Sequence, residues 1–282
     1  MKRLLTIMAC ALPFCVGAGT CVADDYSDMI TALSPVGYWR LGENSGSTAN
    51  DEMNVSNGTY KNEPDQGNSG AISGNYAPIF DGSDDWVSIP HKAAYLLDEG
   101  AISFWFRVVY AEPDEDEQDM SRKGIFTKDS TNYDTGGHIS VMMIDTHIEA
   151  RMQSTSNSYT LVSSNFTITD WNHALILFGP DGMEMYLNGN LEDWDSYSGG
   201  LGSTSGGTGN FEPIVIGANS WTSGNLSETP LIGYFEGQVD EVVLLDFTPT
   251  PTQITNLSSS DGGPPAGVRV VEWHVDPPID AY

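Results

Sequence analysis

Acidic residues end or interrupt two apolar runs that lie far apart in the chain. Glu43 closes the run that begins at Val36, and Asp240 lies inside the run from Gly237 to Leu245. A strand core does not normally accept a carboxylate, so these groups need a partner. A metal ion is the leading candidate. The alternative is that Glu43 or Asp240 pairs with Arg40 in a buried salt bridge.

Calcium suits this set of side chains because Ca²⁺ takes about six to eight oxygen ligands from carboxylates, carbonyls and water. We expect Glu43, Asp51 and Asp240 to supply the carboxylate oxygens. The loops 42–46 and 49–52 can supply backbone carbonyls nearby.

A second set of residues has the chemistry of a sugar platform. Sugars are held by aromatic faces and by amide or carboxylate groups that bind their hydroxyls. Trp194 and Trp221 lie among polar residues that include Asn219 and Asn225. Tyr133 and Tyr197 could add to the same rim. The alternative is that each tryptophan folds back over a sheet edge.

The sequence does not predict an enzyme. A retaining glycosidase needs two carboxylates about 5.5 Å apart on one face. Asp193 and Asp195 alternate but lack a third carboxylate in phase, and the neighbours Asp240 and Glu241 are expected to point to opposite faces of a strand. A divergent glycanase therefore remains an alternative rather than the main interpretation.

Short apolar or alternating runs separated by turn residues predict an all-β protein. The clearest strands are expected at 101–108, 138–144, 147–153, 174–178, 183–187, 213–216 and 233–245, with weaker ones at 77–80 and 86–89. Asn188-Gly189 is a strong hairpin signal. One short helix is expected after Thr250, because Thr250-Pro251-Thr252-Gln253 has the pattern of a capping box.

Six motifs carry a resemblance to a known family. In order along the chain they are Tyr38-Trp39-Arg40-Leu41-Gly42-Glu43, Phe80-Asp81-Gly82-Ser83-Asp84-Asp85-Trp86-Val87, Ile102-Ser103-Phe104-Trp105-Phe106, Trp171-Asn172-His173, Met185-Tyr186-Leu187-Asn188-Gly189 and Gly237-Gln238-Val239-Asp240-Glu241-Val242. The stretch from Tyr26 to Leu257 resembles laminin G-like jelly-roll domains of the concanavalin A-like lectin/glucanase superfamily.

The resemblance implies two antiparallel sheets stacked face to face. It also implies a calcium ion near the edge where the N-terminal and C-terminal strands meet. It is less informative about function, because this fold carries binding modules, adhesins and some glycanases.

The first residues predict export. Lys2 and Arg3 precede an apolar run, and Cys21-Val22-Ala23 has the small residues of a cleavage site, so residues 1–23 are interpreted as a signal peptide. All three cysteines fall inside it, which leaves the exported chain without a disulfide. No later segment reaches the roughly 20 apolar residues that a membrane span needs. We expect a secreted, extracellular or periplasmic protein that is not inserted in a membrane.

The chain is strongly acidic, with a formal net charge of −28. This charge argues against nucleic acid and anionic membranes as partners, and it keeps an extracellular protein dissolved. The expected partner is a glycan or a polymer of the extracellular matrix or cell surface.

Residues 24–257 are expected to form the jelly-roll domain, and residues 258–282 a linker and a strand-like tail. A lone strand at 268–275 must pair with an edge of its own domain or with another chain, so an oligomer is possible. The acidic stretch 112–119 is expected to be a loop, and 81–85 a tight turn.

We therefore expect a noncatalytic carbohydrate-binding or adhesion module with a structural calcium site. A structural surface or assembly protein that uses its C-terminal strand is the second interpretation.

Overall fold

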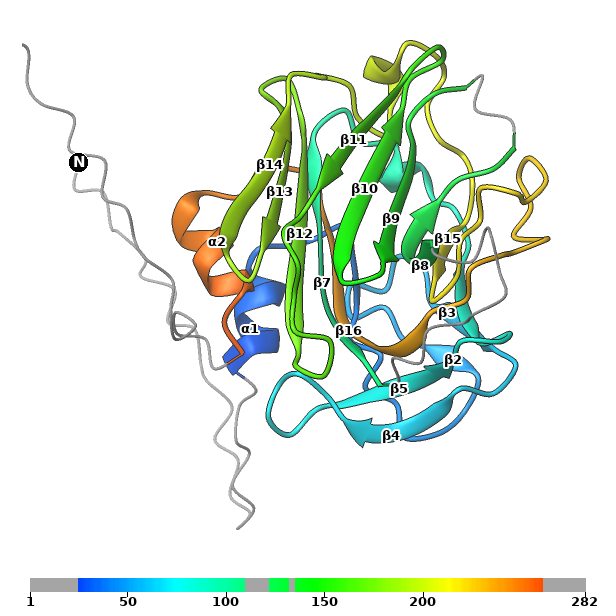
Figure 1. Cartoon of the computed structure of the whole chain (residues 1–282), viewed down its shortest axis with the longest axis vertical. Helices are drawn as coiled ribbons and strands as arrows, with labels where there is room; N and C mark the ends of the chain where they lie inside the picture. Colours follow the sequence, from blue (N-terminus) through cyan, green and yellow to red (C-terminus); the bar gives the residue numbers. More distant parts are fainter. Residues whose placement is uncertain (1–24, 110–121, 132–134, 261–282) are drawn as a thin grey trace, which may run out of the picture.

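Two antiparallel β-sheets packed face to face make up the molecule (Figure 1). The computed structural model describes residues 25–109, 122–131 and 135–260. The expected signal peptide, the acidic stretch 112–119, Tyr133 and the strand-like tail lie outside these residues. The predicted concanavalin A-like jelly-roll sandwich is confirmed.

The first sheet, called sheet A, has the strand order β14-β13-β12-β7-β16-β5-β4, and β1 also pairs with β16. Its strands are β1 (Gly37–Trp39), β4 (Asp65–Ser69), β5 (Tyr76–Asp81), β7 (Gly100–Val108), β12 (Asn172–Gly179), β13 (Gly182–Leu187), β14 (Asn190–Asp195) and β16 (Glu236–Leu245).

The second sheet, called sheet B, has the order β11-β10-β9-β8-β15-β6-β3-β2. Its strands are β2 (Thr48–Ala49), β3 (Gly58–Lys61), β6 (Trp86–Ile89), β8 (Arg122–Lys128), β9 (His138–Ile144), β10 (His147–Gln153), β11 (Ser158–Val162) and β15 (Ile214–Ile216). Two 3₁₀ helices, Ala93–Tyr95 and Ser203–Ser205, lie in the connections.

The main core lies between the two sheets, and it explains why the central strands are apolar. Phe104 and Phe106 of β7 pack in one buried cluster with Phe126 of β8 and Ile139 of β9. Burying such side chains contributes roughly 1.5–3 kcal/mol each. The sandwich is therefore held by apolar packing, with no cysteine in any described residue.

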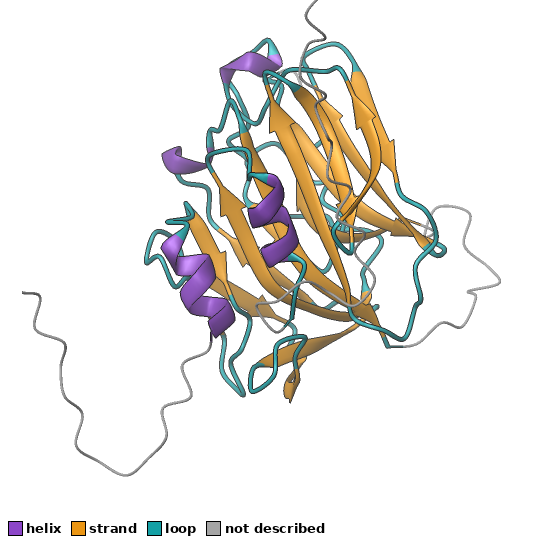
Figure 2. Ribbon diagram, turned by 90° about the vertical axis from the view of Figure 1, so that its left-hand side faces the viewer, coloured by secondary structure: helices purple, strands orange, loops and turns teal. Residues whose placement is uncertain are grey.

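Two helices cover the outer face of sheet A, as Figure 2 shows. Helix α1 (Asp25–Ala32) and helix α2 (Pro251–Leu257) belong to a second buried cluster with the alternate residues of β7, among them Trp105. The Tyr26 hydroxyl donates to the Leu257 carbonyl (2.9 Å) and accepts from the Trp105 indole (3.0 Å). Strand β7 is thus buried on both faces, which accounts for its unbroken apolar pattern.

Most of the predicted strands are confirmed, and the strands at 86–89, 138–144 and 147–153 match in both bounds. The predicted ranges do not include strands β1, β2, β3, β4, β8, β11 and β14, or helix α1. The expected strand 233–245 begins only at Glu236. No helix in the described part of the chain is long and apolar enough to cross a membrane.

The predicted helix α2 begins with a complete capping box. The backbone N–H of Thr250 donates to the Gln253 side chain (2.8 Å), and the Thr250 hydroxyl accepts from the Gln253 N–H (3.4 Å). Replacing Thr250 by Ala should cost about 1 kcal/mol of unfolding free energy. The melting temperature should fall by roughly 2–4 °C, which calorimetry can measure.

Thr252 is the matched control for this change, because it lies in the same turn, is exposed and carries no capping bond. Equal melting temperatures for Thr250→Ala and Thr252→Ala would contradict the assigned role of the cap.

Candidate functional site

The first and last strands of the sandwich meet at one place. Strand β1 pairs with β16 so that Trp39 lies opposite Val242. The pairing of β16 with β7 shifts register between Asp240 and Val243, and Glu241 has φ 52°. This bulge breaks the alternation of side chains.

The bulge brings Asp240 and Glu241 together. The Asn75 side-chain amide donates to both carboxylates, at 3.0 Å to Asp240 Oδ1 and 2.8 Å to Glu241 Oε1. Both acidic side chains are fully buried. The expectation that these neighbours point to opposite faces is therefore wrong, because the bulge turns them toward one amide.

Glu241 is the partner of Arg40 at this junction. The Arg40 guanidinium donates to Glu241 Oε1 from Nε (3.1 Å) and from Nη2 (3.0 Å), and the Tyr38 hydroxyl donates to Oε2. The salt bridge with Arg40 that was expected for Glu43 or Asp240 is thus made by Glu241, which the sequence analysis did not select.

Burial opposes a negative charge on Asp240. Its Oδ2 accepts from the Ala71 N–H (2.8 Å), and a Cβ on Gly70 would lie only 2.5 Å from that oxygen, so the close approach requires glycine. Burial, and then the negative charge of Glu241, raise the pKa of Asp240 well above its usual value.

Glu43 lies at the same edge of the sandwich. Its Oε1 accepts from the Asn50 backbone (2.8 Å) and side chain (2.7 Å), and its Oε2 accepts from the Tyr60 hydroxyl (2.7 Å). Burial, then Glu43, and to a smaller extent Asp240, raise the pKa of Tyr60 above its usual value. Tyr60 is thus hydrogen-bonded to Glu43 and feels the charge of Asp240 at longer range. We call Glu43, Asp240 and Glu241 the acidic junction.

Asp51 has a different task from the one predicted. It is buried, and its two carboxylate oxygens accept four backbone N–H groups, those of Tyr38 (3.0 Å), Met53 (3.1 Å), Val55 (2.8 Å) and Ser56 (2.8 Å). These bonds shape the turn after β2 and attach it to β1. They account for Asp51 without a metal ion.

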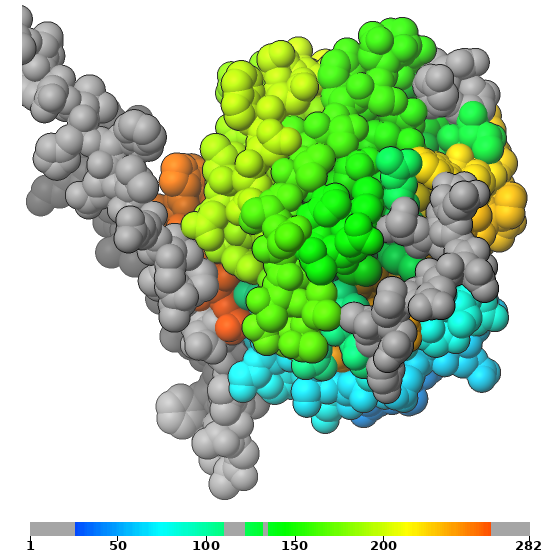
Figure 3. Space-filling model, viewed as in Figure 1, coloured from blue at the N-terminus to red at the C-terminus, as the bar shows by residue number. Residues whose placement is uncertain are grey.

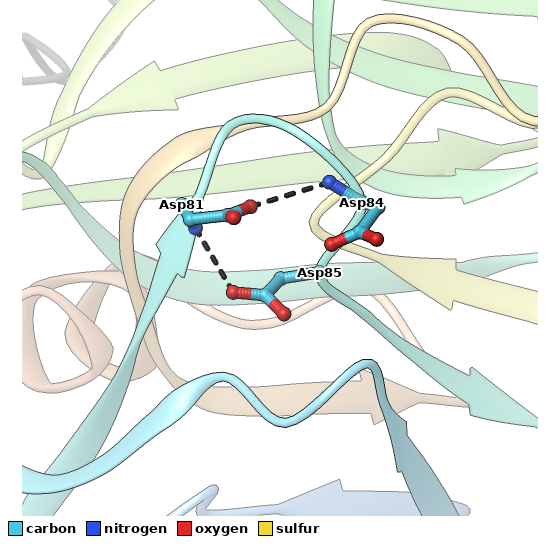
Figure 4. Close-up of side chains that lie close together, drawn as sticks. All are labelled: Asp81, Asp84 and Asp85. Carbon is cyan, nitrogen blue, oxygen red and sulfur yellow. Dashed lines mark hydrogen bonds between the residues drawn. The ribbon is translucent and has the colours of Figure 1, made fainter.

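Asp81, Asp84 and Asp85 form the one group in the described residues whose three ligand atoms lie within 4.8 Å of one another (Figure 4). Asp81 Oδ1 accepts from the N–H groups of Ser83 (2.8 Å) and Asp84 (3.2 Å), and Asp85 accepts from the Asp81 N–H (3.1 Å). Burial and the Asp81 charge raise the pKa of Asp85 to about 6. The predicted tight turn between β5 and β6 is confirmed.

The expected platform of two loop tryptophans is not assembled. Trp194 belongs to β14, an edge strand of sheet A, and is 65 % exposed. Trp221 is half-buried over sheet B, where the guanidinium carbons of Arg122 and Arg151 lie 5.4 and 4.6 Å from its ring centroid. The two tryptophans therefore contact different sheets.

The predicted amide partners also differ from expectation. Asn219 is fully buried, where it accepts from the Trp221 N–H (3.1 Å) and contacts Met142 Sδ. It cannot reach a surface ligand in this arrangement. Asn225 is exposed beside Leu226, which is 66 % exposed, in the loop that follows Trp221. Tyr133 lies outside the described residues.

A polar groove lies beside the β13–β14 hairpin and was not predicted. It has a volume of about 310 Å³ and is lined by Ser164, Asn165, Phe166, Thr167, Asp170, Trp171, Asn172, Leu187, Asn188, Asn190 and Glu192. The Asn188 amide donates to the Asn172 side chain (3.0 Å), which fixes two of these groups. The Asn/Ser/Thr-rich stretches 163–172 and 188–190 are the signal that could have located it.

The acidic residues of β14 join the two sheets at this edge. Glu192 accepts from the Ser164 N–H (2.8 Å), and Asp193 accepts from the Val162 N–H (3.0 Å) at the end of β11. Asp195 accepts from the Tyr197 N–H (2.7 Å). Each of these carboxylates, considered above for glycan cleavage, thus binds a backbone N–H group.

We call the exposed surface around this junction the β11–β14 seam. Besides Trp194, it presents Leu191, which is 53 % exposed, and Val162, which is 43 % exposed. Figure 3 shows that the segments from β9 to β14, coloured green to yellow-green, form much of one face of the molecule. The seam combines an exposed indole, apolar neighbours and an amide-rich groove.

A buried polar cluster at β8 and β9 is structural. Asp129 accepts from His138 (3.0 Å), Ser140 (2.7 Å) and Arg151 (2.7 Å). The Lys128 ammonium donates to the backbone (2.7 Å) and side chain (3.0 Å) of Asn210, and burial lowers the pKa of Lys128 to about 7. These bonds fix the loops that follow β8 and precede β15.

The architecture and the exposed edge define a lectin-like β-sandwich. The profile of the family described as the concanavalin A-like lectin/glucanases superfamily matches residues 81–255, and the chain belongs to this family. No curated protein matches the sequence.

Solved structures with the same fold include domain 4 of AbnA, an extracellular arabinanase of Geobacillus stearothermophilus, determined in complex with arabinotriose. That domain has a TM-score of 0.56 and 15 % identity over 80 % of this chain and 98 % of the domain.

The binding domain of botulinum neurotoxin serotype D has a TM-score of 0.56 and 13 % identity over 82 % of this chain and 55 % of that domain. A structure titled for the interaction of botulinum neurotoxin type C with two ganglioside molecules has a TM-score of 0.56 and 12 % identity. The match covers 82 % of this chain and 52 % of that structure's chain. It therefore spans about half of the toxin chains.

The four N–H bonds of Asp51 allow a direct test. Asp51→Asn keeps the shape but turns an amide NH₂ toward backbone donors, and should reduce the unfolding free energy by about 2–3 kcal/mol. Urea denaturation measures this loss. Glu52→Gln, at an exposed neighbour, should change stability by less than about 0.5 kcal/mol. Equal stability of the two variants would refute the role given to Asp51.

Proposed function

We propose that this protein is a secreted, noncatalytic carbohydrate-binding module that binds a glycan of a cell surface or extracellular matrix at the β11–β14 seam. The observation that carries the proposal is Trp194, which is 65 % exposed on a strand rather than on a loop. A tryptophan held on a rigid strand offers a flat apolar face at little entropic cost.

The surroundings of Trp194 support the same function. Glu192 lines the polar groove and lies two residues from Trp194 on β14. Asn188 and Asn190 line the groove from the turn between β13 and β14. An apolar surface beside convergent amides and carboxylates is typical of sugar sites. Relatives with this fold include domains solved with arabinotriose or described with gangliosides, which agrees with a glycan as ligand.

Trp194→Ala tests the site. Removing the indole should weaken glycan binding at least about tenfold, or ~1.4 kcal/mol. The measurement is titration calorimetry against a panel of arabinan, xylan, cello-oligosaccharides and chito-oligosaccharides.

Leu226→Ala is the control for this test, because it removes an equally exposed apolar side chain in a loop away from β14, and the glycan affinity of this variant should be unchanged. Loss of binding in Trp221→Ala with full binding in Trp194→Ala would move the site to the outer face of sheet B. The absence of binding to every glycan would refute the function.

We also propose that the acidic junction holds a structural calcium ion through Glu43 and Asp240. The support is the charge balance, because Asp240 and Glu241 are both fully buried and one guanidinium, that of Arg40, pairs with Glu241. Buried carboxylates without full compensation are costly, and either a proton or a cation removes the cost. An ion bound by these carboxylate oxygens would stabilise the place where the first and last strands meet.

Calcium should therefore raise the melting temperature of the metal-free protein by several degrees. The raised pKa of Asp240 means that, without calcium, its contribution to stability is full below pH ~4 and is lost as the pH rises through the raised value. Protons compete with the ion, so the calcium effect should be larger at pH ~7.5 than at pH ~5.

Asp240→Asn is the matched variant for this prediction. It should melt at the same temperature with calcium and with chelator, because it removes one of the two proposed carboxylate ligands. A calcium effect that survives in this variant would contradict the assignment, as would identical melting of the natural chain with and without calcium.

A further inference from the structure

The charges at the β11–β14 seam all have one sign. Strands β11, β13 and β14 and the segment 163–171 contain no Lys or Arg, and their charged residues are Asp170, Glu184, Glu192, Asp193 and Asp195. In the cross-strand register Glu184 lies opposite Trp194, and Glu192 and Asp193 directly precede it. The Glu184 carboxylate therefore lies on the same face of the sheet as the indole, while Glu192 and Asp193 turn to the Ser164 and Val162 N–H groups.

The partners of these carboxylates are neutral donors. Within the described ranges none of the five forms an ion pair. Glu192, Asp193 and Asp195 accept backbone N–H groups, and Glu184 accepts the Tyr186 hydroxyl (2.6 Å). Neutral donors of this kind fix the direction of a carboxylate without cancelling its charge. One basic side chain contacts the groove lining from a neighbouring strand: the guanidinium carbon of Arg107 lies 5.1 Å from the Trp171 ring centroid, and Arg107 Nε donates to Gln238.

A ligand that stacks on Trp194 therefore meets Glu184 on the adjacent strand and the net negative charge of the other seam carboxylates at longer range. An acidic sugar, such as a uronate or a sulfated residue, would be repelled, and a neutral sugar would be accepted without preference. A sugar that carries an ammonium group would satisfy both features, because its ring C–H face can cover the indole while its charge faces the carboxylates.

We propose that the ligand of the seam is a polymer of amino sugars whose amines are protonated, such as a deacetylated chitin. This inference rests on the proposed function and names its ligand class. The gain arises from long-range attraction at an exposed site, so it should amount to about tenfold in affinity at low salt and should be screened at high salt.

The experiment compares two oligomers that differ only in the amine, a glucosamine hexamer and an N-acetylglucosamine hexamer. Calorimetry at pH ~6 is run at low and at high salt, on the order of 0.03 M and 0.5 M, where the screening lengths differ several-fold. The glucosamine hexamer should bind about tenfold more tightly at low salt, and the two should differ by less than about twofold at high salt.

Two variants localise the effect. Glu184→Gln, which loses only its charge beside the Tyr186 hydroxyl, and Glu192→Gln should each reduce the preference for the glucosamine hexamer about twofold. Asp65→Asn removes one charge from β4, at the opposite edge of sheet A, and should preserve the preference. Trp194→Ala should weaken the binding of both hexamers.

The outcomes separate this inference from the function on which it rests. If neutral glycans bind in a Trp194-dependent way and the glucosamine hexamer shows no advantage, the ligand class is wrong and the module remains. If Asp65→Asn reduces the preference as much as Glu192→Gln, overall charge is responsible and the seam is not selective. If no glycan of either kind binds, both proposals fail.

Discussion

The burial of Asp240 beside Glu241 is the constraint around which the two ends of the sandwich are arranged. Consecutive residues of a regular strand would face opposite sides, and only a bulge with Glu241 in the left-handed region brings both carboxylates to Asn75. The same bulge places Glu241 against Arg40, which follows β1. One local irregularity therefore joins the last strand to the first by ion pairing as well as by backbone bonds.

The neighbouring elements depend on this junction. Strand β1 has only three residues and is fully buried, so it gains little stability by itself and relies on its pairing with β16. Helices α1 and α2 then pack on the same face of sheet A, linked by the hydroxyl of Tyr26. The chain thus closes near where it begins without a disulfide, and the charge concentrated at this closure explains why a cation is an attractive partner.

Burial on both faces made some strands recognisable from the sequence. Strands such as β7 and β12 are buried on both faces and appear as unbroken apolar runs, so the fold class could be predicted. Edge strands carry little of this pattern. Strand β4 is Asp-Gln-Gly-Asn-Ser, and β14 is mostly polar, because each has one neighbour and one open side. For this reason Trp194 was interpreted as a loop residue although it lies on a strand.

Sequence was a weaker guide to the sites because their geometry depends on irregular backbone. Glu43 and Asp240 could be selected because carboxylates in apolar runs are unusual, but the pairing of Glu241 with Arg40 requires a bulge that no residue type announces. Asp51 has the composition of a metal ligand and the contacts of a turn organiser. Residue type alone does not distinguish these roles, because a metal ligand and a turn-stabilising residue both use carboxylate oxygens.

The difference between the two candidate sites follows from where each lies in the sandwich. At the acidic junction, charge is buried and only partly compensated by Arg40, so its first effect is on stability. At the β11–β14 seam, Glu192 and Asp193 accept hydrogen bonds from backbone N–H groups at the edge of the facing sheet. These bonds occupy edge groups that could otherwise pair with another chain. Trp194 remains exposed on the same strand, β14, next to these half-buried carboxylates. An exposed indole adds little to folding in that position, and for this reason we assign the proposed glycan site to it.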